Sequence, residues 1–127
     1  MRLALDTNTY SAQILNDPDV TKYINAANTI YMPSIVMGEL RAGFEYGSRT
    51  ELNHEMLNEF LQAANTDILH VTETSTQLYA KIFALLRKIG RPINTNDIWI
   101  AALCIENNLP LLTKDQDFKH IEGLELV

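Results

Sequence analysis

Four acidic residues, far apart in the sequence, stand where carboxylates could serve one common site. Asp6 follows the apolar run at 3–5, and Asp115 follows a second apolar run at 110–113. Glu39 and Asp97 fall early in two segments with helical spacing. Carboxylates that are brought together repel one another unless a cation lies between them, and their oxygens suit Mg²⁺ or Mn²⁺. The four acids could therefore form a site for divalent cations, provided that the fold brings them together.

Each acid also has an ordinary structural explanation. Asp6 could end a strand and cap the next helix, and Glu39 could be a solvated helix residue. Asp97 could be a helix-start acid, while Asp115 and Asp117 could cap a short turn. No single spacing is diagnostic, so the inference depends on the combination.

The elements that must position the acids are short apolar runs alternating with longer segments of helical periodicity. Strands are predicted at 3–5, 29–33, 67–71, 110–113 and 124–127. Helices are predicted from Asp17-Pro18 onward, from Ser34 as the cap to near Gly47, and at about 51–64, 74–89 and 98–105. This alternation predicts an α/β sandwich around a mainly parallel sheet.

The predicted sheet places the acids at one edge. In open α/β sheets, ligands collect beyond the carboxyl ends of the strands, where Asp6 and Asp115 fall. Asp97 opens an apolar helix, whose positive N-terminal end favours an anion. Glu39 lies about one turn into its helix, so its side chain can point back toward that helix's N-terminus.

Length and composition limit the class of protein. The 127 residues predict a single domain spanning 1–127, without repeats or linkers, and no apolar run is long enough to cross a membrane. A single cysteine, Cys104, favours a reducing compartment, so a cytoplasmic location is expected. The net charge of −6 argues against a protein that binds nucleic acid with its whole surface. Several of those charges would, however, be metal ligands.

Four sequence blocks, in order and at family spacing, resemble the PIN domain and, within it, the VapC toxins of bacterial toxin–antitoxin pairs. They are LDTN at 5–8, GELRAGFEYG at 38–47, GRPINTNDIWIAA at 90–102 and LLTKDQDFKHIEGLEL at 111–126. The resemblance implies a three-layer α/β/α sandwich. It also implies that the metal-binding acids are Asp6, Glu39, Asp97 and Asp115, with Asp117 as an accessory acid and Asn8 and Thr113 as residues that orient them.

The same resemblance implies an activity and partners. The activity would be a Mg²⁺- or Mn²⁺-dependent endoribonuclease that cuts structured RNA, such as tRNA or rRNA, to leave 5′-phosphate and 3′-hydroxyl ends. A small DNA-binding antitoxin would place an arginine near the acids and contact the helix bearing Leu40 and Phe44. A homodimer is also expected. Arg41, Arg91 and Lys114 are candidate contacts for RNA phosphates.

Other readings remain open at this point. A metal-free ribonuclease would need general acid–base residues such as a histidine pair, but His54, His70 and His120 lie in unrelated contexts. A haloacid-dehalogenase-type phosphatase needs a second acid where Asn8 stands, and a phospho-acceptor signalling domain needs an acidic pair near the N-terminus. A stand-alone PIN nuclease and a non-cleaving PIN-fold interaction domain are the nearest alternatives. Trp99 and Cys104 are expected to be core residues.

Overall fold

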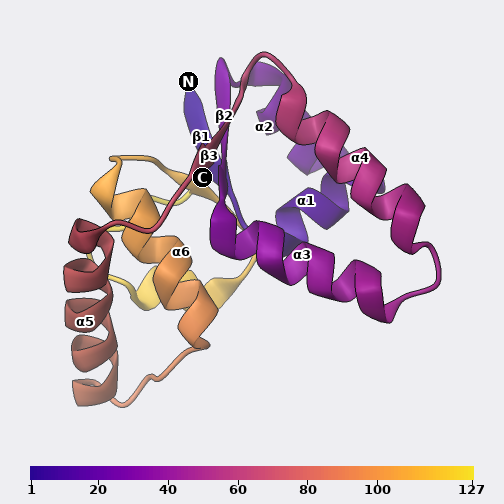
Figure 1. The fold of residues 1–127 in the computed structure, drawn as a ribbon. Coiled ribbons are helices and arrows are strands. Elements are labelled where there is room, and N and C mark those ends of the chain that lie inside the picture. The colour runs from indigo at the N-terminus through magenta and orange to yellow at the C-terminus, as the bar shows by residue number, and fades with distance from the viewer.

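Four parallel strands form the centre of the computed structural model, which describes all 127 residues (Figure 1). They are β1 (Arg2–Leu5), β2 (Thr29–Pro33), β3 (Thr66–Leu69) and β4 (Leu111–Leu112), arranged in the order β3-β2-β1-β4. β1 therefore pairs with both β2 and β4, although β4 comes more than a hundred residues later in the chain. The expectation of a mainly parallel sheet is confirmed, since all the pairings are parallel.

Helices cover both faces of this sheet, which gives the expected three layers. On one side lie α5 (Glu73–Lys88) and α6 (Thr95–Glu106), and on the other lie α1 (Thr7–Ile14), α2 (Pro18–Ala26), α3 (Ser34–Tyr46) and α4 (Thr50–Gln62) (Figure 1). A short 3₁₀ helix, η1 (Gln116–His120), follows β4. None of these helices has the length and apolar character needed to cross a membrane.

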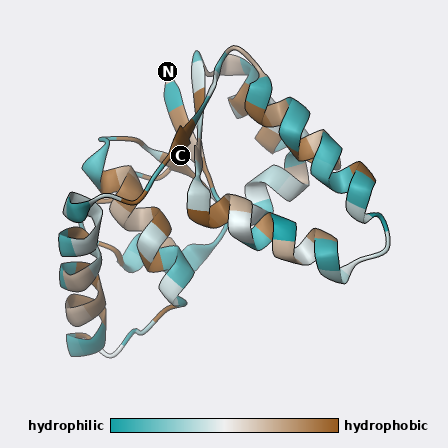
Figure 2. Cartoon of the chain, viewed as in Figure 1, coloured by the Kyte–Doolittle hydropathy of each residue, from teal (hydrophilic) through white to brown (hydrophobic).

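The strands and α6 supply much of the core. Leu3, Ala4 and Leu5 of β1 are fully buried, as expected for a parallel strand covered on both faces. Along α6, all residues from Ile98 to Cys104 are buried except Trp99, which confirms that this helix lies in the core (Figure 2). Trp99 is only partly buried, so the expectation that it is a core residue is wrong; its ring instead stacks on Tyr79 of α5, with centroids 4.1 Å apart.

One of the two predicted helix caps is confirmed and the other is wrong. Asp17 caps α2 by accepting the backbone N–H groups of Asp19 and Val20, as expected. Ser34 is not a cap, so that prediction is wrong: the cap position belongs to Pro33, whose extended backbone carries β2 directly into α3. α1 was not predicted as an element, because its segment has no clear apolar stripe.

The predicted last strand at 124–127 is also wrong as a strand. The chain there forms one isolated bridge, between Leu126 and Leu111, supported by backbone hydrogen bonds to β4. Since β4 itself has only two residues, the tail has too short an edge to extend into a regular strand.

Candidate active site

Asp6 sits where β1 ends, and the neighbouring strand determines its surroundings. The β1–β4 register pairs Leu5 with Leu112, so Asp6 faces Thr113. The Thr113 hydroxyl donates to Asp6 Oδ2, and the backbone N–H of Thr9 donates to Oδ1 at 2.8 Å. Asp6 therefore does cap α1, as its structural explanation suggested, and its side chain is nearly buried. The same hydrogen bonds fix the carboxylate at the sheet edge.

A cavity of about 200 Å³ opens beside Asp6. No hydrophobic residue lines it; its walls are Asp6, Thr7, Asn8, Glu39, Asn94, Asp97 and Asp115. The fold therefore brings the four predicted acids to one cavity, from the ends of β1 and β4 and from α3 and α6. No histidine lines this cavity, so it lacks the general acid–base pair of a metal-free ribonuclease.

Glu39 is held by neutral donors from two other helices. Thr7 Oγ1 donates to Glu39 Oε1 at 2.7 Å, and Asn96 Nδ2 lies 3.4 Å from Oε2. Thr7 and Asn96 were not identified from the sequence. The available signal for Thr7 was its place beside Asp6 in the first turn of α1, whereas nothing marked Asn96 as a partner of an acid 57 residues away.

Asp97 lies in the first turn of α6, directly after the cap. Asn94 caps this helix by accepting the N–H of Asn96 at 2.8 Å, so Asp97 is an acid of the first turn rather than the cap itself. Burial raises the pKa of Asp97 to about 6, and the negative charges of Asp115, Glu39, Asp6 and Asp117 add to that rise. A cation beside Asp97 would therefore stabilise its charged form at neutral pH.

Asp115 and Asp117 differ in their relation to the cavity. The backbone N–H of Asp115 donates to Thr113 Oγ1 at 3.0 Å, which ties Asp115 to the residue that also holds Asp6. Its Oδ1 accepts the N–H of Asp117 at 2.9 Å and so caps η1. Asp117 is exposed and does not line the cavity. Of the four neighbouring acids, it contributes least to the raised pKa of Asp97.

Of the two predicted supporting residues, Thr113 contacts the acids and Asn8 only lines the cavity. Thr113 contacts both Asp6 and Asp115, in keeping with a role in orienting the acids. Asn8 lines the cavity with an exposed side chain, but the hydrogen bonds that hold the acids come from Thr7, Thr9, Asn96 and Thr113.

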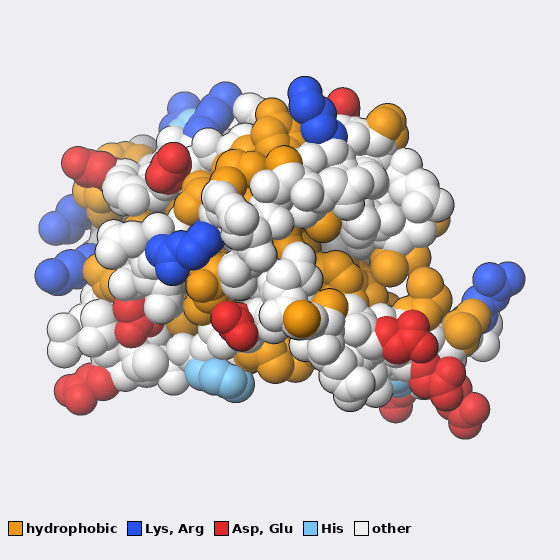
Figure 3. All heavy atoms as spheres, turned by 90° about the horizontal axis from the view of Figure 1, so that it is seen from above, with side chains coloured by type: hydrophobic (Ala, Val, Ile, Leu, Met, Phe, Trp, Pro, Cys, Tyr) orange, Lys and Arg blue, Asp and Glu red, His pale blue; other side chains and the backbone are white.

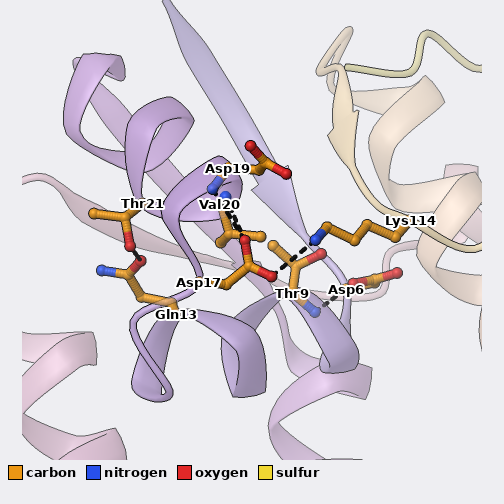
Figure 4. Close-up of polar contacts among 8 residues, drawn as sticks. All are labelled: Asp6, Thr9, Gln13, Asp17, Asp19, Val20, Thr21 and Lys114. Atoms are coloured by element: carbon orange, nitrogen blue, oxygen red, sulfur yellow. Dashed lines mark hydrogen bonds and ion pairs between the residues drawn. The ribbon is translucent and has the colours of Figure 1, made fainter.

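The three predicted phosphate contacts lie outside the cavity wall. Lys114 pairs with Asp17 Oδ2 at 2.8 Å, as Figure 4 shows, and this pairing raises the pKa of Lys114 and lowers that of Asp17. Arg41 donates to Asn58 and contacts His54 Nδ1, both at 2.8 Å. Arg91 faces His120. Seen from above, the side on which β1 begins, the surface carries charges of both signs without a continuous basic area (Figure 3).

The donors around the cavity suit a hard divalent cation, because every titratable group in its wall is a carboxylate. As the side chains stand, no three acids are close enough together to hold one ion. Thr9 and Thr113 hold Asp6, and Thr7 and Asn96 hold Glu39, so hydrogen bonds to neutral donors fix these two carboxylates. The donor set therefore fits such an ion chemically, and ligation requires side-chain rotation.

The sequence matches the PIN domain over residues 3–124, and the chain belongs to the PIN-domain family. It is similar to Ribonuclease VapC2 of Rickettsia felis, with 33% identity over 128 residues that cover 96% of this chain and 93% of that protein. Ribonuclease VapC5 of Mycobacterium tuberculosis is 29% identical over 89 residues, covering 70% of this chain and 66% of that protein.

A solved structure has the same fold over the full length. It is the crystal structure of VapBC2 from Rickettsia felis bound to a DNA fragment from their promoter, with a TM-score of 0.89 and 29% identity. The alignment covers 100% of this chain and 98% of that chain. Family membership sets aside the phosphatase and signalling alternatives.

Proposed function

We propose that the protein is a VapC-type toxin, an endoribonuclease that a cognate antitoxin neutralises. The observation that carries the proposal is the all-polar cavity in which Asp6, Glu39, Asp97 and Asp115 meet at the carboxyl edge of the sheet. The VapC names of the similar proteins and the full-length agreement with the VapBC2 structure support it. The substrate is a structured RNA, with tRNA or rRNA as the first candidates.

Asp6, Asp97 and Asp115 would hold Mg²⁺ or Mn²⁺, with Glu39 facing the same space and Asp117 accessory. Such ions supply an activated water for in-line attack on phosphorus and stabilisation of the leaving 3′-oxygen. The chain's own groups prepare the site. Thr9 and Thr113 fix the Asp6 carboxylate, and Thr7 and Asn96 direct Glu39. Asp97, whose pKa of about 6 leaves it mostly ionised at neutral pH, would bind a cation in its deprotonated form.

The activity is tested with purified protein on total RNA and on separated tRNA and rRNA. Cleavage should stop in EDTA and return with Mg²⁺ or Mn²⁺, and the new ends should be 5′-phosphates that an RNA ligase can join directly. Asp6→Asn should abolish cleavage with the fold intact. Cleavage that persists in excess chelator, or ends carrying 2′,3′-cyclic phosphate, would contradict this mechanism.

A second cavity, an apolar groove, supports the proposal that an antitoxin binds this protein. It measures about 220 Å³, between α1 and the pair α3–α4, and is lined by Tyr10, Ser11, Ile14, Leu15, Phe44, Asn53 and Met56. Leu15 is 81% exposed beside it. α1 begins at the acidic cavity and ends at this groove, so one peptide could lie in the groove and place an arginine on the acids. Phe44 is available to such a peptide, whereas the expected contact Leu40 is only 4% exposed.

The antitoxin proposal is tested by expressing the chain in its native host with and without the neighbouring small gene. Expression alone should arrest growth, and co-expression should restore it. Leu15→Asp should escape neutralisation while it still cleaves RNA, because Leu15 is exposed at the groove and lies at the opposite end of α1 from Asp6. Tagged Asp6→Asn protein should recover the antitoxin. Recovery of a homodimer alone would instead favour a stand-alone PIN nuclease. The homodimer itself stays a prediction.

A further inference from the structure

A third hollow, on the opposite side of the molecule from the α1 groove, combines an apolar floor with a charged rim. It lies between α5, α6 and the end of η1 and measures about 210 Å³. Leu78, Ile82, Leu85, Ile105 and Ile121 contribute to its floor. Leu85 is 40% exposed, so apolar surface there faces solvent. The groove therefore offers apolar surface on which a flat apolar group could lie.

The rim of this α5–α6 groove carries Lys81, His120 and Glu122. Arg91 joins it, because Arg91 Nη1 lies 3.5 Å from His120 Nε2. The protein's ion pairs are Lys114–Asp17 and His54–Glu45, so neither Lys81 nor Arg91 has a carboxylate partner. Arg91 and His120 share one long hydrogen bond, and the guanidinium keeps other N–H donors that an anion could accept.

Two chain segments connect the groove with the acidic cavity. Arg91 precedes the cavity residues Asn94 and Asp97 in one segment, and η1 runs directly from the cavity residue Asp115 to His120. A polymer held in the cavity could therefore extend along either segment toward the groove. Figure 1 shows α5 and α6 on the side of the sheet away from α4, so the antitoxin groove stays separate.

We propose that the α5–α6 groove binds one unpaired nucleotide of the RNA substrate. The base lies on the apolar floor, and its phosphate lies on Arg91, His120 and Lys81, since exposed bases and backbone phosphates are what proteins recognise in single-stranded RNA. Glu122 accepts hydrogen bonds from base N–H groups. Guanine presents adjacent N1–H and N2–H₂ donors, whereas uracil has a single N3–H, so guanosine is preferred over uridine. This nucleotide site rests on the proposed function and adds a second contact for its RNA substrate.

The first test needs no cleavage. The full chain with labelled isoleucine methyl groups is titrated with guanosine, adenosine, cytidine and uridine 5′-monophosphates and with inorganic phosphate. Guanosine monophosphate should shift the methyl signals of Ile105 and Ile121 but not that of Ile14, which lines the antitoxin groove. Absence of groove shifts at millimolar nucleotide overturns the proposal. Equal shifts with inorganic phosphate overturn it too, because they would indicate a plain anion site.

The second test measures RNA binding in the Asp6→Asn background. Arg91→Gln and Lys81→Gln should each weaken binding and lower the slope of log affinity against log salt by about 0.7, the value for one lost single-strand phosphate contact. Leu85→Ser should weaken binding without changing the slope. Lys22→Gln on α2 removes the same charge from an exposed position elsewhere and should change neither quantity. Unchanged binding in all three groove variants overturns the proposal.

Two controls separate the competing explanations. If Leu85→Ser converts a dimer to a monomer in light scattering, the groove is a contact between copies, and the nucleotide proposal fails. If the wild-type chain does not cleave RNA, the proposed function fails, while the mononucleotide titration still decides the groove on its own. Normal cleavage by wild type together with unaffected groove variants removes this inference and leaves the nuclease.

Discussion

At the scale of the residue, the surroundings of Asp97 disfavour its negative charge. Its pKa of about 6 lies above the value of about 3.9 for an aspartate in an unfolded chain. The unfolded state therefore loses this proton at lower pH than the native state does. The favourable contribution of protonated Asp97 to folding is complete below pH 4 and is lost as the pH rises through 6.

Asp97→Asn should consequently raise the melting temperature of the metal-free protein at pH 7 to 8, and the gain should shrink as the pH falls below 6, where wild-type Asp97 is protonated. Asp117→Asn is the matched control. It removes one charge from an exposed acid outside the cavity, so its effect should be smaller and nearly independent of pH. Thermal unfolding of the three proteins in chelator between pH 4 and 8 measures this. A large loss of stability in Asp97→Asn would mean that the side chain is needed for the helix start rather than for the site.

At the scale of the element, the first turn of α6 positions Asp97 by means of its cap. Asn94→Ala removes the acceptor for the Asn96 N–H and should cost about 1 kcal/mol of unfolding free energy. It should also weaken divalent-cation binding, because Asp97 and Asn96 lie in the turn that frays. Asn94→Ser keeps a capping oxygen without adding a charge to the acidic cavity and should restore stability. Urea unfolding and calorimetric titration with Mn²⁺ measure both effects; full stability in Asn94→Ala would rule out the cap as a support.

Elements with a strong pattern were predictable from the sequence, and short or partner-dependent ones were not. The apolar residues of α6 and β1 determine buried elements by themselves, and so the edge that carries the four acids could be anticipated. α1 has no such pattern, and the tail at 124–127 depends on an edge of β4 that proved too short. The contacts of Glu39 with Thr7 and Asn96 depend on three helices meeting, which no local spacing encodes.

At the scale of the whole molecule, the proposed cation site joins residues from β1, α3, α6 and the segment after β4. A ligand that binds the folded state alone stabilises it, by about 2.7 kcal/mol at a hundred times the dissociation constant. Saturating Mn²⁺ should therefore raise the melting temperature of wild type, and Asp6→Asn should lose most of that increase. The Asp117→Asn protein should keep it. An unchanged melting temperature of wild type in Mn²⁺ would argue against the cation site.

The pairing of β1 with β4 also has a consequence for how the protein is made. Asp6 leaves the ribosome early, but its strand neighbour and the hydroxyl of Thr113 follow 107 residues later. A nascent chain that carries only the first three acids lacks β4, Asp115 and the Thr113 hydroxyl that holds Asp6. The complete set of contacts around Asp6 can therefore form only after nearly all of the 127 residues have emerged.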